Sequence, residues 1–208
     1  MEDAIKSTNK YIVICLQTLG FFVFHVLLAI FYDIEITLPA NFNKLKKGTL
    51  FVANHQTRLD PFIALYPLRF ILFLKILPVR FPVTNEYMQK PFLSKLLKLT
   101  GCYSVGQTSR ENMIALMYTA KLIKDGETVF LFPEGGITRE GDDLKKFKKG
   151  IEFFVRKSKN VVFVKMQGFN AIRLPSLRKK CSITVSPIKN LSEEELTTED
   201  FELLLKQL

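Results

Sequence analysis

The chain has 208 residues, of which 48% are hydrophobic and 24% charged, so it is long and apolar enough to fold as one domain and is not a disordered protein. Its 30 lysines and arginines exceed its 20 acidic residues and give a net charge of +10, which predicts an anionic partner such as nucleic acid or acidic lipid. The three cysteines, Cys15, Cys102 and Cys181, have the spacing of neither a zinc site nor a disulfide framework, which favours a reducing compartment.

The first element expected along the chain is a long apolar helix. Residues 11–32, YIVICLQTLGFFVFHVLLAIFY, contain no Asp, Glu, Lys or Arg. A helix of that length rises about 33 Å, close to the thickness of the hydrocarbon layer of a bilayer. No A-x-A-like cleavage site follows, as a secretory signal peptide would require. We therefore expect a membrane-associating segment over residues 1–40, formed either by one helix or by an interfacial hairpin that folds back at Gly20.

Polar residues inside this apolar run leave a second interpretation open. Gln17, Thr18, Gly20 and His25 would also suit the buried core helix of a soluble protein. In either setting His25 is expected to hydrogen-bond to another helix rather than to catalyse a reaction. The charges that flank the run are mixed, so they do not fix its orientation.

Two later runs mix basic and apolar residues, at 69–81 and 144–157. Each has the pattern of an amphipathic face with a solvated side. Together with the apolar N-terminal segment they also suit a domain that lies on acidic lipid, where each nearby Lys or Arg contributes about 1 kcal/mol. We expect a membrane-associated protein at the cytoplasmic face of the cell membrane.

After the apolar run, strand and helix patterns alternate. Strands are expected at 34–39, 48–54, 70–75, 102–105, 127–135, 160–170 and 181–188. Helices are expected from Asp60, over 86–101 with an interruption at Pro91, over 109–126 with Ser109 as its cap, over 144–158, and at the C-terminus, where Ser192 and Glu195 form a capping-box pattern. This alternation predicts an α/β fold in residues 41–208, with a central, mostly parallel or mixed sheet flanked by helices.

The candidate site lies at the carboxyl ends of two of these strands, where α/β sheets bind their ligands. The apolar run LFVAN delivers His55 to one such end, and VFLFP delivers Glu134 to another. Asp60, followed by Pro61, has the pattern of a helix start, and that structural role is one interpretation of it. Alternatively, the loop can fold the imidazole back onto the Asp60 carboxylate, which would fix the tautomer and leave the other ring nitrogen to remove a proton. No protein nucleophile accompanies the pair, so the attacking group would be a hydroxyl of the substrate.

Two segments then resemble a known family. NHQTRLD, residues 54–60, resembles the N-H-x-x-x-x-D block of the glycerolipid acyltransferases of the bacterial 1-acylglycerol-3-phosphate acyltransferase type, and LFPEGGITRE, residues 131–140, resembles their F-P-E-G-x-R block with residues inserted. The resemblance covers roughly residues 45–190. It implies transfer of a fatty acyl group from acyl-CoA or acyl carrier protein to a lysophospholipid hydroxyl at a membrane, with no metal or other cofactor.

The resemblance also implies roles for single residues. His55 would be the general base and Asp60 its orienting partner, while Glu134, Gly135, Gly136 and Arg139 would hold the acceptor. The family's block G-x-x-F-I-x-R falls on residues 101–107, where Gln107 stands in place of the phosphate-binding arginine. Arg110 is a candidate replacement. A further basic position of the family falls on Thr84 or Asn85, so the acceptor head group stays open between lysophosphatidate and another lysolipid.

Three other functions compete with this one. A catalytically inactive relative would bind membranes or partners without turnover, and the Gln107 departure favours it. Binding of nucleic acid would explain the charge but neither the apolar segment nor the spacing of His55 and Asp60, so no nucleic-acid partner is expected. A metal site built from His55, Asp60 and Glu134 would have two carboxylates and one histidine from distant positions, which is a weak pattern, and no metal is expected.

Overall fold

The computed structural model describes residues 9–106, 108–138, 145–169, 179–191 and 194–208. Its elements in chain order are α2 (Lys10–Phe31), β1 (Tyr32–Thr37), the 3-10 turn η1 (Phe42–Lys44), β2 (Thr49–Ala53), α3 (Asp60–Ile63), α4 (Phe70–Ile76), β3 (Val79–Thr84), α5 (Asn85–Met88), α6 (Pro91–Leu99), β4 (Cys102–Val105), α7 (Ser109–Lys124), β5 (Thr128–Leu131), α8 (Ile151–Lys157), β6 (Asn160–Gln167), β7 (Lys179–Val185) and α9 (Thr198–Lys206).

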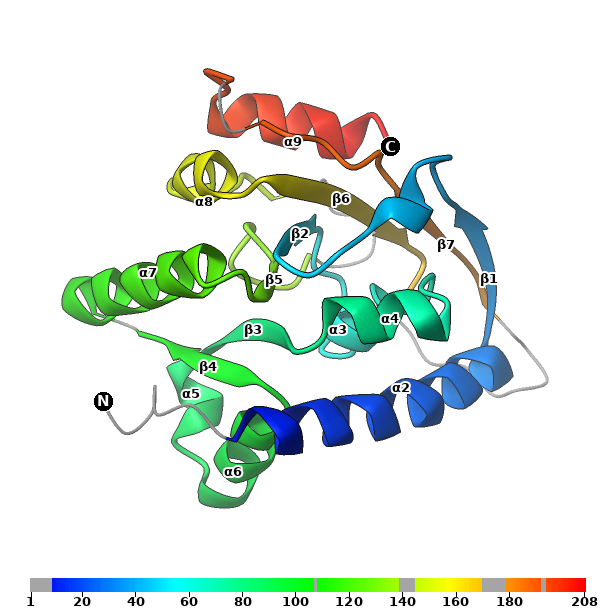
Figure 1. The fold of residues 1–208 in the computed structure, drawn as a ribbon, viewed down its shortest axis with the longest axis horizontal. Coiled ribbons are helices and arrows are strands. Elements are labelled where there is room, and N and C mark those ends of the chain that lie inside the picture. The colour runs from blue at the N-terminus through cyan, green and yellow to red at the C-terminus, as the bar shows by residue number, and fades with distance from the viewer. Residues whose placement is uncertain (1–8, 107, 139–144, 170–178, 192–193) are drawn as a thin grey trace.

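The strands form one sheet in the order β1-β7-β6-β2-β5-β3-β4. All neighbouring strands are parallel except β6 and β7, which run antiparallel. Figure 1 shows α2, α3 and α4 on one side of the sheet and α7, α8 and α9 on the other. The predicted α/β fold with a mostly parallel, mixed sheet is therefore confirmed.

The central strands are apolar on both faces because both faces are covered. In β2, Phe51 and Ala53 belong to the hydrophobic cluster that packs on α2, α3 and α4, whereas Leu50 and Val52 belong to the cluster under α7, α8 and α9. A strand buried on both sides reads as a continuous apolar run rather than an alternating one, which is why LFVA was recognisable in the sequence.

The segment 70–75, predicted as a strand, is helical. α4 spans Phe70–Ile76 and buries Leu72, Phe73 and Ile76, and the next strand, β3, begins only at Val79. A short apolar run fits either structure, and here the helix places three apolar side chains on one face against the core. The chain leaves α4 at Leu77 in an extended conformation, as a residue before proline prefers.

Three predicted helix starts are also corrected. The cap of α7 is Thr108 rather than Ser109, and Thr108 forms a capping box with Glu111. In the described part of that segment, residues 145–158, only Ile151–Lys157 is helical, because Gly150 adopts a left-handed conformation at the start of α8. At the C-terminus Thr197 and Asp200 form the capping box of α9; Glu195 precedes this helix, and Ser192 lies outside the described residues.

The apolar segment forms one uninterrupted helix, so the hairpin at Gly20 is wrong. α2 packs lengthwise on the domain, with Val13, Phe21 and Leu28 buried. The Gln17 side chain donates to the carbonyls of Val79 (2.6 Å) and Thr100 (2.8 Å) and accepts from the Val79 amide at 3.0 Å. β1, which follows α2 directly, pairs with β7 in the same sheet. A division of the chain at residue 40 stays a prediction.

His25 forms hydrogen bonds, as expected, but with its own helix and with a loop rather than with another helix. Its Nε2 lies 3.0 Å from the carbonyl oxygen of Tyr66, a residue that follows α3, and its Nδ1 lies 2.8 Å from that of Phe21. The neighbouring Phe24 stacks on Phe62. These contacts tie the middle of α2 to the segment that follows β2.

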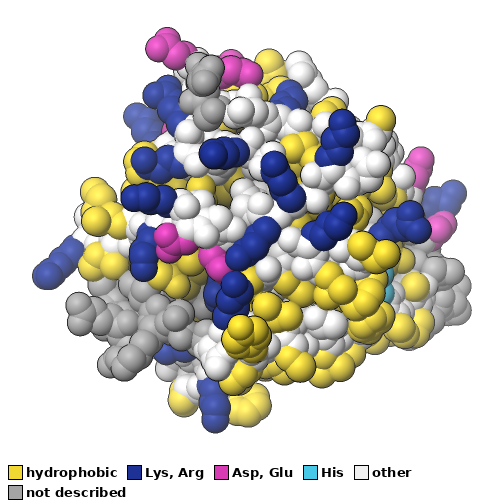
Figure 2. Space-filling model, viewed as in Figure 1, with side chains coloured by type: hydrophobic (Ala, Val, Ile, Leu, Met, Phe, Trp, Pro, Cys, Tyr) yellow, Lys and Arg dark blue, Asp and Glu magenta, His cyan; other side chains and the backbone are white. Residues whose placement is uncertain are grey.

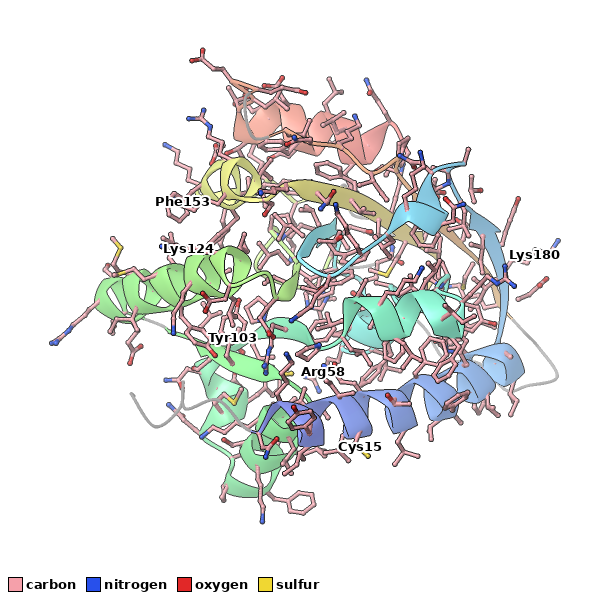
Figure 3. The ribbon with its side chains drawn as sticks, in the orientation of Figure 1. Cys15, Arg58, Tyr103, Lys124, Phe153 and Lys180 are labelled. Atoms are coloured by element: carbon pink, nitrogen blue, oxygen red, sulfur yellow. The ribbon has the colours of Figure 1, made fainter. Side chains whose placement is uncertain are left out.

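The opposite side of α2 is left largely exposed by the described residues. We call it the outer face; its exposed apolar side chains are Ile12, Leu19, Phe22, Val23, Val26, Leu27 and Ile30. Cys15 is exposed on the same side, and Figure 3 shows it pointing away from the body of the protein. α2 is the one described helix that is long and apolar enough to cross a membrane, which by itself is weak evidence for membrane association.

Candidate active site

The site lies where β2 and β5 end side by side. These strands pair in parallel, with Val52 opposite Leu131, so the loops that follow them meet at one edge of the sheet. His55 lies in the loop after β2, and Glu134 lies in the loop after β5. Two residues 79 positions apart in sequence are thereby brought into direct contact.

The loop from His55 to Asp60 folds back on itself around one carboxylate. Nδ1 of His55 lies 2.6 Å from Oδ2 of Asp60, whose side chain is fully buried. The same oxygen accepts the amide hydrogens of Gln56 (2.5 Å) and Thr57 (2.9 Å), and the Thr57 hydroxyl donates to Oδ1 at 3.1 Å. The expected meeting of imidazole and carboxylate is therefore present.

Asp60 does not cap the helix that follows it. It is the first residue of α3, the cap position is Leu59, and no side-chain cap bond forms there. The predicted cap therefore lies one residue too late in the sequence. The carboxylate instead turns back to the loop, where four donors hold it in place.

The second ring nitrogen of His55 is available to a substrate. Its side chain is 21% exposed, and its ring stacks on Phe132 with centroids 4.5 Å apart. Among the described residues Nε2 has no hydrogen-bond partner. Because the carboxylate acceptor at Nδ1 favours a proton there, Nε2 carries the lone pair that a general base needs.

Glu134 joins the two loops. Its carboxylate is buried and accepts the amide hydrogen of His55 at 2.8 Å, the hydroxyl of Thr138, and the amide of Lys145 at 3.4 Å. The Thr138 amide in turn donates to the carbonyl oxygen of His55 at 2.7 Å. Both backbone groups of His55 are thus bonded to the second loop, so Glu134 braces the position of the imidazole. Whether it also holds an acceptor stays a prediction.

Two lysines gather at the glycines of the second loop. Gly135 has φ +67°, and a Cβ built on it would lie 2.5 Å from Nζ of Lys148, so the ammonium group covers this glycine. Lys145 donates from Nζ to the carbonyl of Ile137, next to the half-buried Gly136. From the sequence, the pattern KKFKK was interpreted as an amphipathic face or as a surface that lies on acidic lipid, and not as part of the site. The missed signal was the position of this run, which begins 11 residues after Glu134 and lies in the same loop between β5 and α8.

Of the other predicted site residues, one lies away from His55 and two lie outside the described residues. Arg110 is exposed in the first turn of α7, which follows β4, and β4 lies three strands from β2, about 14 Å at the usual strand spacing. The structure does not bring Arg110 to His55. Gln107 and Arg139 lie outside the described residues.

Two surface hollows border α9 or the segment before it, and neither adjoins His55. The larger, of about 620 Å³, lies between α8 and the segment before α9 and is lined by Glu152, Phe153, Arg156, Lys157, Leu196 and Thr197. The other also borders α9. Among the described residues no group of three or more His, Cys, Asp or Glu side chains is arranged to hold a metal ion.

The sequence pattern of the acyltransferase family matches residues 33–168, a span that contains the whole site described above. The chain belongs to the acyltransferase family. Its fold is similar to the crystal structure of the 1-acyl-sn-glycerophosphate (LPA) acyltransferase PlsC from Thermotoga maritima, with a TM-score of 0.62 and 18% identity over 85% of this chain and 68% of that one. A comparison with curated proteins finds no match. The family and the fold implied by the two sequence blocks are thus confirmed.

Proposed function

We propose that this acyltransferase is a membrane-bound O-acyltransferase that moves a fatty acyl group from acyl-CoA or acyl carrier protein to the free hydroxyl of a lysophospholipid-type acceptor. The observation that carries the proposal is the 2.6 Å contact between His55 and the buried Asp60, with Nε2 of His55 unengaged among the described residues. The fold match to a protein named as an LPA acyltransferase supports 1-acylglycerol-3-phosphate, or a related lysolipid, as the acceptor class.

In the proposed reaction His55 acts as a general base. Nε2 removes the proton of the acceptor hydroxyl while the oxygen attacks the thioester carbonyl, forming a C–O bond. Asp60 holds the ring and stabilises the imidazolium. When the tetrahedral intermediate collapses, the C–S bond breaks and the imidazolium returns its proton to the departing thiolate. The products are an ester and a free thiol, and His55 is regenerated.

His55→Ala tests this proposal. A positioned general base contributes about 100- to 10,000-fold in rate, so the variant should lose at least 100-fold in kcat. The measurement is acceptor-dependent release of free thiol from a long-chain acyl-CoA. Asp60→Asn should also lower kcat, and an unchanged circular dichroism spectrum would show that the fold is kept. Turnover by His55→Ala at the wild-type rate would refute the mechanism.

A catalytically inactive, membrane-binding relative is the second candidate function. It is favoured by Gln107, which replaces a phosphate-binding arginine in the family pattern. Both candidates predict binding to vesicles, but only the enzyme releases thiol in proportion to added acceptor. A panel of lysolipids that differ in head group, assayed with the wild-type protein, separates them.

The membrane part of the proposal is supported by a continuous apolar surface. Phe70 of α4 packs on Phe22 of the outer face, with ring centroids 4.9 Å apart, and Ile71 and Leu74 of α4 are also exposed. Figure 2 shows hydrophobic side chains gathered along the lower edge, where α2 lies in Figure 1, while most Lys and Arg side chains lie higher on this face. Because α2 is bonded lengthwise to the domain, we infer that it lies in one leaflet, along the membrane surface, rather than crossing it.

A further inference from the structure

Arg58 carries a positive charge in the same loop as the proposed base, three residues after His55. Its side chain is exposed, and the guanidinium carbon lies 5.6 Å from the ring centroid of Tyr87 in α5. Among the described residues it takes part in no ion pair or hydrogen bond. An aromatic ring orients a guanidinium without using its five N–H donors, so those donors stay available to a ligand.

The backbone beneath Arg58 is fixed. The Leu59 amide donates to the Thr57 hydroxyl at 2.9 Å, and the Gln56 side chain accepts the amide hydrogen of Phe169 at 3.2 Å. The bonds to Asp60 close the same loop. Arg58 therefore starts from a defined position relative to His55, which is the condition for a cation to orient a substrate rather than only attract it.

The direction of the side chain places its charge over the active edge of the sheet. Tyr87 belongs to the helix that follows β3, and β3 neighbours β5, whose loop carries Glu134 and Gly135. Lys148 covers Gly135 in that loop. Two cations thus stand at this edge of the sheet: Arg58, in the loop of His55, reaches towards the helix that follows β3, and Lys148 lies in the loop that follows β5. In the view of Figure 3, Arg58 lies between the ribbons of β3 and α2.

We propose that Arg58 binds a phosphate ester of a substrate and so orients it towards His55; this rests on the proposed function. A planar guanidinium fork matches the oxygen geometry of a phosphate, and a dianion needs more than one cation to balance its charge. The family pattern predicts a basic residue at Thr84 or Asn85, and Arg58 reaches the same helix start from another loop. The phosphate belongs either to the acceptor or to coenzyme A, and the kinetics distinguish these sources.

The kinetic test compares Arg58→Gln with Arg58→Lys and with Arg156→Gln, a matched control. Arg156 is exposed in the last turn of α8, so its substitution removes the same charge away from the site. The substrates are 1-acylglycerol-3-phosphate against the same acylglycerol without phosphate, and acyl-CoA against a short thioester without phosphates. Loss of a charged hydrogen bond should raise KM about 10- to 150-fold for the phosphate-bearing partner alone, with kcat little changed. Arg58→Lys should fall in between, because it keeps the charge but loses the fork.

A rise in KM confined to the acceptor with phosphate assigns the site to the acceptor, and one confined to acyl-CoA assigns it to the donor. An equal loss with and without phosphate, or no change, overturns the proposal. Arg156→Gln should behave as the wild type.

A binding measurement separates failure of this site from failure of the proposed function. Glycerol 3-phosphate, for the acceptor, and coenzyme A, for the donor, are each titrated calorimetrically into wild type, His55→Ala, Arg58→Gln and Arg156→Gln in detergent micelles, and the ligand that wild type binds is compared across the variants. We expect binding by all except Arg58→Gln, whether or not the wild type transfers an acyl group. If no variant turns over but this pattern holds, the enzymatic proposal fails and the phosphate site stands. Equal binding of both ligands by Arg58→Gln and wild type, or binding of neither ligand by wild type, overturns the site.

Discussion

At the scale of single residues, the two carboxylates of the site bond to different parts of the histidine loop. Asp60 faces the imidazole and the loop amides, whereas Glu134 bonds to the backbone of His55 and to Thr138. The first contact was predictable, because a histidine and an aspartate five residues apart can meet within one loop. The second was not, since it depends on β2 and β5 being neighbours although β3 and β4 lie between them in sequence.

Glu134→Gln distinguishes bracing from acceptor binding. The amide can keep one acceptor bond but presents an N–H₂ group to two donors, so we expect a less stable protein, by about 1–3 kcal/mol, and a lower kcat with little change in the KM for acceptor. Thr138→Val is the control, because it removes one bond to the same carboxylate. Urea unfolding and steady-state kinetics measure both effects. A large rise in the KM for acceptor with unchanged kcat would show instead that Glu134 holds the acceptor.

At the scale of elements, sequence patterns located most strands but misassigned α4. Strands covered on both faces show uninterrupted apolar runs, and β2, β5 and β6 all have them. The run at α4 is similar in composition, and only its packing against α2, including the stacking of Phe73 on Phe21, decides that it is helical. Such tertiary contacts are not encoded in local periodicity.

The thiol of Cys15 reports on the outer face of α2. Cys15 is exposed, while burial raises the pKa of Cys102 to about 12 and keeps that thiol protonated at neutral pH; Cys181 is buried. A water-soluble maleimide should therefore label Cys15 first. Anionic vesicles should slow this labelling at least tenfold if the outer face inserts, as followed by mass spectrometry. Labelling at the same rate with and without vesicles would contradict insertion.

The contact between α8 and α9 should depend on pH. Burial raises the pKa of Glu152, but hydrogen bonds from the Thr198 hydroxyl and the Gly150 amide outweigh it and hold the pKa below its ordinary value of 4.5. A carboxylate with a lowered folded pKa stabilises the fold above its unfolded pKa and loses that contribution as the pH falls through the folded value.

Wild type should therefore exceed Glu152→Gln in unfolding free energy at pH 7, and the gap should narrow below about pH 4.5. Urea titrations of both proteins at several pH values measure it. A gap that widens as the pH falls would contradict the assignment.

At the scale of the whole molecule, charge and apolar surface should act together on a membrane. Exposed basic residues, among them Arg69, Lys75 and Lys95, flank the exposed apolar side chains of α4 and α6. Screening shortens the reach of such charges to about 3 Å at 1 M salt, while apolar insertion is not weakened by salt. We expect vesicles with acidic lipid to bind more tightly than neutral ones at low salt, and a salt-resistant fraction to persist. Complete release at high salt in a flotation assay would show that the charges alone bind the membrane.

The two-way hydrogen bonding of the Gln17 amide has a consequence for any attempt to obtain a detergent-free catalytic fragment. Deleting α2 would remove the hydrogen bonds that the Gln17 side chain makes with the amide and the carbonyl of Val79 at the start of β3. It would also expose Phe73, on which Phe21 stacks. The fragment without α2 would expose more apolar surface and would aggregate more readily than the full chain. A water-soluble form is better sought by replacing exposed apolar side chains of the outer face with polar ones while α2 stays in place.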